Sequence, residues 1–158
     1  MKKWIISMIL LLVVLTGFSI FIYIEARKPI QDAEILAVQK AKEVAGLQTT
    51  DKFYLYHGTE TYFVVIGDDK KKEKKVVWIP EKADEEVIVK SYNKGISEEQ
   101  ARKKLQAEKK PKEILGIHLG IEKNIPIWEI SYLDKNERLN YYYIDFASGD
   151  WWRKIENL

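Results

Sequence analysis

The 158-residue sequence contains no cysteine, which excludes disulfide bonds and an N-terminal lipoprotein anchor on a cysteine. A structural zinc site is not expected either, because such sites typically use cysteine thiolates. Only two histidines are present, His57 and His118. Neither has a His-x-x-His or paired-carboxylate neighbourhood, so we expect no metal site at either residue.

Motifs for catalysis are also missing. Ser97 and Ser148 fit a helix cap and a turn, and neither lies in a G-x-S-x-G sequence. The Gly-x-x-x-Gly sequence from Gly116 to Gly120 lies in a strand-like segment without the context of a phosphate-binding loop. We therefore predict a protein that is not an enzyme and binds no cofactor, and no small-molecule substrate is evident.

The chain has no large excess of either charge, with 26 Lys and Arg against 24 Asp and Glu. Residues 1–28 hold four of the basic and one of the acidic residues, so 22 basic and 23 acidic residues remain for the rest. Nucleic-acid binding requires a strongly basic surface, and this near-neutral remainder argues against it.

Residues Trp4–Ile24 form a run of 21 residues without charge. As a helix this run would span roughly 31 Å, close to the hydrocarbon thickness of a bilayer. A signal peptide has a shorter apolar region, which is followed by a cleavage site of small residues. The residues that follow this run, Glu25–Pro29, contain no A-x-A pattern. We predict an uncleaved, single-pass anchor through residues 4–24.

The orientation of this anchor follows from its flanks. Lys2 and Lys3 precede the run, and Arg27 and Lys28 follow it, so the charge asymmetry is slight. A long domain after a short basic start predicts a cytoplasmic N-terminus. The protein is then expected in the cell membrane, with its C-terminal domains extracytoplasmic.

The remaining residues alternate between helical and strand-like patterns. Lys28-Pro29 is expected to separate the span from an amphipathic helix over residues 30–44, whose apolar face holds Ile30, Ala33, Ala37, Ala41 and Val44. A second helix begins at Ser97, which forms a capping box with Gln100, and ends near Pro111. Strands are predicted at residues 53–57, 62–66, 76–79, 87–89, 114–122, 127–133, 139–146 and 151–155.

The order of helix and four strands occurs twice, and an offset of about 65 residues aligns the two copies. Phe63 then matches Trp128, and Asp69 matches Asp134. We predict an α+β protein with one N-terminal transmembrane helix and two small units, each a helix on a four-stranded antiparallel sheet. The expected segments are a cytoplasmic start and anchor over 1–28, a first unit over 29–92 and a second over 93–158.

Three sequences give the chain a family resemblance: residues 96–101 (ISEEQA), residues 128–132 (WEISY) and residues 143–150 (YIDFASGD). They resemble a PepSY domain, and two such halves behind one span resemble the YpmB/TseB-like membrane proteins of Gram-positive bacteria. This resemblance implies cystatin-like/PepSY-like units and a part in cell-wall elongation. It also implies association with a class B penicillin-binding protein.

Aromatic residues crowd the last third of the chain. If Trp128, Ile130 and Tyr132 face the second helix, strand alternation predicts a shared face that also holds Tyr142, Ile144, Phe146, Trp151 and Ile155. Tyr141, Tyr143 and Trp152 would then lie on the opposite face. Two interpretations stay open: the other half of the chain covers these three residues, or they form a protein-binding patch.

A basic cluster lies at the tip of the hairpin between the second and third predicted strands: Lys70, Lys71, Lys72, Lys74 and Lys75. It is either a solvated turn or a contact for anionic lipid headgroups or wall polymer. The leading functional hypothesis is a membrane-anchored protein that binds and modulates a wall-synthesis enzyme. The alternatives are a PepSY-type inhibitor or regulator of an extracellular peptidase, and a module that binds anionic wall polymer or lipid.

Overall fold

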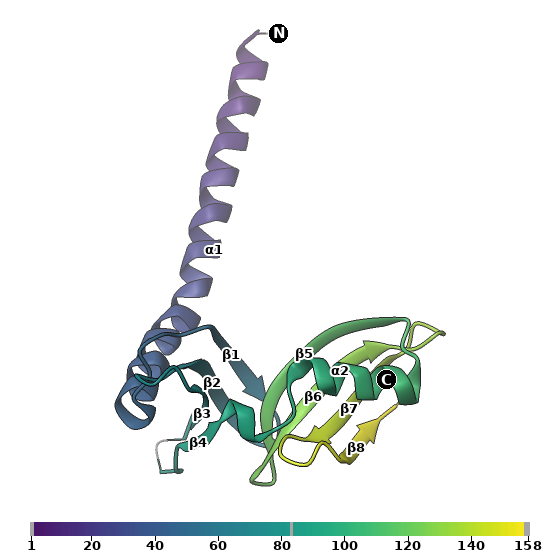
Figure 1. The fold of residues 1–158 in the computed structure, drawn as a ribbon. Coiled ribbons are helices and arrows are strands. Elements are labelled where there is room, and N and C mark those ends of the chain that lie inside the picture. Colours follow the sequence, from purple (N-terminus) through teal and green to yellow (C-terminus); the bar gives the residue numbers. More distant parts are fainter. Residues whose placement is uncertain (1, 83, 157–158) are drawn as a thin grey trace. The chain divides into compact units, whose positions relative to one another are not determined.

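The computed structural model describes residues 2–82 and 84–156. Residues 1, 83, 157 and 158, which belong to the predicted anchor segment and to the two predicted units, lie outside the described residues. Contacts within the chain divide it into residues 1–35 and residues 36–158. Both four-stranded sheets belong to the second of these parts (Figure 1).

The N-terminal element is one helix, α1 (Lys2–Ala45). Its stretch from Met8 onward is long and apolar enough to cross a membrane, and no part of its most apolar window is buried within the molecule. The predicted break at Pro29 is wrong, because Pro29 lies inside α1. Proline removes a single helical hydrogen bond, and the residues on both sides remain helical.

All eight predicted strands are confirmed. The first sheet contains β1 (Lys52–His57), β2 (Thr61–Asp68), β3 (Lys74–Pro80) and β4 (Ile88–Ser91). The second contains β5 (Glu113–Glu122), β6 (Ile125–Leu133), β7 (Leu139–Asp145) and β8 (Trp151–Ile155). In each sheet the strands follow chain order and all pairs are antiparallel, so each sheet is a meander.

The end of α1 covers one face of the first sheet. Ala37 and Ala41 are buried there and belong to one apolar cluster with Val65 and Val77. The predicted apolar stripe is thus confirmed only in its middle, because Ile30 and Val44 are exposed. Gly46 ends the helix with a positive φ of 68°.

The second helix, α2 (Glu98–Lys109), begins as predicted. The backbone N–H of Gln100 donates to Ser97 Oγ, and the Ser97 N–H donates to Gln100 Oε1, which completes the capping box. Ala101 and Leu105 are fully buried within the core of the second sheet. The helix ends at Lys110, which adopts a left-handed conformation just before Pro111.

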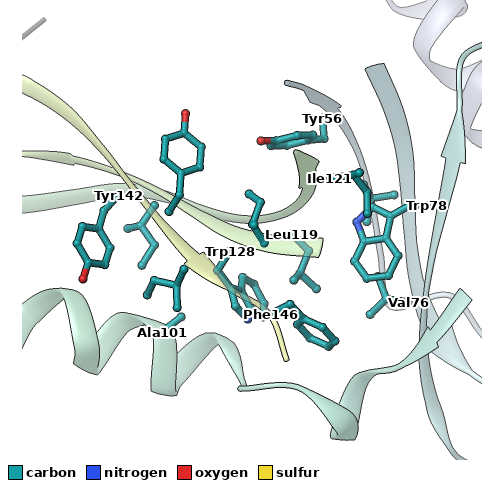
Figure 2. Close-up of a cluster of buried hydrophobic side chains, with 14 of the residues drawn as sticks. Tyr56, Val76, Trp78, Ala101, Leu119, Ile121, Trp128, Tyr142 and Phe146 are labelled. Atoms are coloured by element: carbon teal, nitrogen blue, oxygen red, sulfur yellow. The ribbon is translucent and has the colours of Figure 1, made fainter. Parts of the chain in front are cut away.

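One apolar core joins the two sheets. Trp78 of β3 is fully buried, and its ring lies 6.1 Å from that of Phe146, which directly follows β7. Figure 2 shows Trp78 on the side of the cluster where Ile121 and Phe146 also lie, with Ala101 and Tyr142 at the other end. The first sheet is therefore covered on both faces, by α1 on one and by the second half of the chain on the other.

The two halves share a turn of the same construction. Asp69 Oδ1 accepts hydrogen bonds from the N–H groups of Lys71 and Glu73, at 2.8 and 3.0 Å. Asp134 Oδ1 accepts from Asn136 and Arg138 at the same two distances. This correspondence supports the internal duplication, because the two turns lie at the offset that aligns the halves.

Candidate interaction surface

The histidines and serines that we considered for chemistry lie apart from one another. His57 Nδ1 lies 3.2 Å from the Thr61 hydroxyl at the end of the first hairpin. Ser97 caps α2, and the Ser148 hydroxyl accepts from the Asp150 N–H in a turn. Among the described residues, no group of three or more His, Asp or Glu side chains could hold a metal ion.

A buried polar junction connects the first hairpin to the second sheet. Glu122, at the end of β5, is only 5% exposed. Its carboxylate accepts hydrogen bonds from the Thr59 N–H at 3.0 Å, the Thr59 hydroxyl at 2.7 Å and the Tyr56 hydroxyl at 3.2 Å. The charge of Glu122 is thus compensated by three donors from the other half of the chain.

The same Tyr56 hydroxyl lies 3.2 Å from Glu129 Oε2, so one phenol contacts two carboxylates. Burial raises the pKa of Glu129, although hydrogen bonds from tyrosines and the nearby Arg153 act in the opposite direction. Burial and the charge of Glu129 raise the pKa of Tyr143, so its phenol stays neutral.

The Tyr56 ring packs directly on Gly120. A Cβ at this position would lie 2.2 Å from the ring carbon Cζ of Tyr56.

A second tyrosine closes the free edge of β5. The Tyr54 hydroxyl accepts from the Leu119 N–H at 2.7 Å and donates to the Leu119 carbonyl at 3.2 Å. The imidazole of His118 lies 5.1 Å from the Tyr54 ring, and burial lowers the pKa of His118, which favours the neutral form. The exposed strand edge is thereby blocked at this point from pairing with another chain.

Tyr54 and His118 also line a cleft of about 430 Å³ between the two halves. Its aromatic wall includes Tyr54, Tyr92 and Trp128. Its charged groups are paired with one another, Lys52 with Glu98 at 2.8 Å and Lys74 with Asp51 at 2.5 Å.

The three aromatic residues proposed for protein contact do lie together. The rings of Tyr141 and Tyr143 are 6.5 Å apart and nearly parallel, and the Trp152 ring meets Tyr143 edge-on at 6.1 Å. The guanidinium of Arg153 lies over the Tyr143 ring at 5.3 Å. We call this set of four side chains the aromatic cluster.

The members of the aromatic cluster differ in accessibility. Tyr143 is only 7% exposed, whereas Tyr141 and Trp152 are half-buried. A contact with another protein would therefore be made by Tyr141 and Trp152, whose rings pack against the buried Tyr143. The neighbouring Trp151 is 55% exposed, but it pairs with Ile144 and so lies on the opposite face of the sheet.

The predicted face of β8 is wrong in part. Ile155 pairs with Tyr141 and so belongs to the face of the aromatic cluster, not to the face covered by α2. The cause is an irregularity in the β7–β8 pairing between Tyr143 and Ile144, which shifts the alternation by one residue. Trp151 pairs with Ile144 as expected but is exposed, because β8 is the edge strand.

Of the five lysines predicted at the hairpin tip, Lys70, Lys71 and Lys72 lie between β2 and β3, whereas Lys74 and Lys75 belong to β3. Lys74 pairs with Asp51, and Lys75 pairs with Glu73 at 2.8 Å and Asp69 at 3.6 Å. The other three, Lys70, Lys71 and Lys72, are exposed. None of these three forms an ion pair within residues 2–82 and 84–156, and we call them the lysine triplet.

Comparisons with known proteins agree with this architecture. The model described as "Cell wall elongation regulator TseB-like domain" matches residues 37–80, and the model described as "Peptidase propeptide and YPEB domain" (PepSY) matches residues 95–150. The chain is 33% identical over 143 residues to the "Probable cell wall elongation regulator TseB" of Bacillus subtilis (strain 168). This alignment covers 90% of the chain and 88% of that protein.

The chain belongs to the TseB-like family. A solved structure described as "YpmB protein from Bacillus subtilis" matches the TseB-like chain with a TM-score of 0.71 at 33% identity. The match covers 77% of this chain and 94% of that one. The expected family and the α+β fold class are both confirmed.

Sequence analysis of this TseB-like chain missed the junction of Tyr56 with Glu122 and Glu129. Two signals in the sequence point to it. Gly120 lies inside a predicted strand, which is typical of a place where another group approaches the backbone closely. Glu122 is the last residue of the same strand, and a carboxylate buried there needs hydrogen-bond donors to compensate its charge.

Proposed function

We propose that this protein is a non-enzymatic, membrane-anchored regulator of cell-wall elongation. It acts by binding a wall-synthesis enzyme, a class B penicillin-binding protein. The observation that carries the proposal is the 33% identity over 90% of the chain to a protein named as a probable cell wall elongation regulator. The apolar part of α1 supports a site of action at the membrane, where such enzymes work.

In this proposal the N-terminus is cytoplasmic, and the units over residues 29–92 and 93–158 lie outside the membrane. Residues 4–24 cross the bilayer as the anchor. The near-neutral charge of the chain beyond residue 28 suits a protein that contacts another protein and not nucleic acid.

The aromatic cluster is the proposed contact with the enzyme. Tyrosine, tryptophan and arginine are the residues that most often dominate the energetics of protein interfaces. Tyr141, Trp152 and Arg153 are all partly or fully accessible, and each of these side chains packs against the ring of the buried Tyr143. A preorganised set of this kind loses little side-chain entropy on binding.

Photocrosslinking in intact membranes tests this assignment. A photoreactive phenylalanine analogue at Trp152 should capture a penicillin-binding protein, identified by mass spectrometry. The same analogue at Lys103, whose side chain is 71% exposed on α2, is the matched control and should not. Equal capture from both positions, or no capture from position 152 in a correctly folded protein, would contradict the assignment.

A second candidate function is the inhibition or regulation of an extracellular peptidase. The observation that favours it is the match of residues 95–150 to a model described by peptidase propeptides. The purified protein would then inhibit at least one member of a panel of extracellular peptidases at stoichiometric concentration. Absence of inhibition across the panel would remove this candidate and leave the wall-synthesis proposal untouched.

A further inference from the structure

Each sheet of this protein contains an aspartate turn. A comparison of the two turns shows which residues the turn geometry requires and whether the lysine triplet is among them. In each turn the aspartate N–H and carbonyl also form backbone bonds across the turn: Asp69 with Glu73 and Lys72, and Asp134 with Arg138 and Glu137. Lys72 and Glu137 occupy the same left-handed position, with φ of 60° and 63°. The turn therefore requires the aspartate and a residue that tolerates positive φ.

Although the geometry is shared, the charge is not. From Asp69 to Glu73 the first turn reads DKKKE, whereas the second reads DKNER from Asp134 to Arg138. The second turn is neutral, and Glu137 pairs with Lys112 while Arg138 pairs with Asp134. Since the neutral sequence closes the same turn, the three consecutive lysines of the first turn are not explained by folding.

Three acidic groups near the lysine triplet, those of Asp51, Asp69 and Glu73, are already paired with other lysines. Lys75 pairs with both Asp69 and Glu73, and Lys74 pairs with Asp51. Hydrogen bonds from backbone N–H groups, led by that of Glu73, and the nearby Lys75 keep the pKa of Asp69 below its usual value. Three positive charges thus remain on adjacent exposed residues that form no ion pair in the described part of the chain.

We propose that the lysine triplet binds a flexible polyanion that carries repeated phosphate charges. Ammonium groups are compact, strongly hydrated point charges, which suit a mobile array of phosphates better than a fixed, bidentate partner. No aromatic or aliphatic side chain lies between Asp69 and Lys75, so the tip lacks the anchors of a protein interface or of membrane insertion. Three lysines are also fewer than the basic clusters typical of lipid recognition.

The test uses the full chain in nanodiscs of zwitterionic lipid and a fluorescent long-chain inorganic polyphosphate as the probe. The variant Lys71→Asn/Lys72→Glu gives the first turn the sequence Lys-Asn-Glu of the second. Because that sequence forms the same turn in this chain, the variant should fold like the wild type, as checked by circular dichroism and thermal unfolding. If each lysine contributes roughly a factor of five, polyphosphate affinity should fall at least about thirtyfold.

The matched control is Lys135→Glu/Asn136→Asp, which changes the net charge by the same amount at the equivalent turn. This control should bind polyphosphate within about twofold of the wild type. The logarithmic salt dependence of binding should have a slope of roughly −2 for the wild type and a shallower one for Lys71→Asn/Lys72→Glu.

Three results would overturn the proposal. One is an equal loss of affinity in both variants, which would indicate an effect of net charge. Another is no loss in Lys71→Asn/Lys72→Glu. The third is displacement of polyphosphate by vesicles of phosphatidylglycerol at equal phosphate concentration, which would make the bilayer surface the partner. None of these results depends on which enzyme the aromatic cluster contacts.

Discussion

The Tyr56 hydroxyl donates toward Glu122, a residue 66 positions further along the chain, across a distance of 3.2 Å. This contact joins the first hairpin to the last residue of β5, and Thr59 adds two more hydrogen bonds to the same carboxylate. The two sheets therefore share an apolar core and a buried charged group whose donors all come from the opposite half. Such a junction should make the two halves unfold together.

Tyr56→Phe tests the hydrogen bonds of this junction. The change removes one hydroxyl from two carboxylates and leaves Glu129 without that donor, so we expect a loss of about 1–3 kcal/mol in the free energy of unfolding. Chemical denaturation measures this loss. The control is Tyr62→Phe, an equally buried tyrosine for which the described residues provide no hydrogen-bond partner, and it should change stability by less than about 0.5 kcal/mol. Equal effects from both variants would refute the assigned role.

Gly120→Ala tests the packing of the same tyrosine. The added Cβ would lie within 2.4 Å of three ring atoms of Tyr56, so the ring or the strand must move. We expect a loss of about 1–3 kcal/mol, which is typical of overpacking. In a Tyr56→Ala background the same glycine substitution should have almost no effect. A double-mutant cycle without such coupling would show that the contact is not the cause.

Glu129→Gln tests the electrostatics of the junction. Because burial raises the pKa of Glu129 above its usual 4.5, Glu129 binds a proton more readily in the folded state than in the unfolded state. The stabilisation from proton binding is complete below the usual pKa, and it is lost as pH rises through the raised value. Glutamine stays neutral and can still accept from Tyr56, so the variant should be more stable than the wild type at pH 7.

The difference between Glu129→Gln and the wild type should shrink as pH falls below about 4.5, where both side chains are neutral. Unfolding free energies measured across this range provide the test. If Glu129→Gln is less stable than the wild type at pH 7, the attraction of the Glu129 carboxylate to Arg153 outweighs the cost of burying its charge. That result would contradict a raised pKa of Glu129.

Local sequence patterns were sufficient to predict most elements of the fold. The capping box at Ser97 and the aspartate turns depend on residues within five positions of one another, and the strands show their own alternation. The turn after β7, where sequence analysis placed Ser148, is equally local: Asp145 accepts from the Ser148 N–H, and Gly149 has a φ of 72°. Because these features depend on residues that are close in the sequence, they can be predicted from the sequence alone.

Contacts between distant segments could not be predicted in this way. The alternation of β2 and β3 does not reveal that Trp78 is covered by Phe146. The irregular pairing after Tyr143 displaced Ile155 from its expected face, and nothing in the sequence near Tyr143 signals it. For the aromatic cluster, sequence analysis placed Tyr141, Tyr143 and Trp152 together but did not include Arg153 or predict that Tyr143 would be buried.

The proposed function requires above all that the N-terminal helix holds the folded unit outside the membrane. Because the chain has no cysteine, single cysteines can be introduced without background: Asn136→Cys on an exposed turn and Lys3→Cys before the apolar run. A membrane-impermeant maleimide should label position 136 in intact cells and position 3 only after permeabilisation. Labelling in the reverse order, or recovery of the protein from the medium without its first residues, would contradict the account.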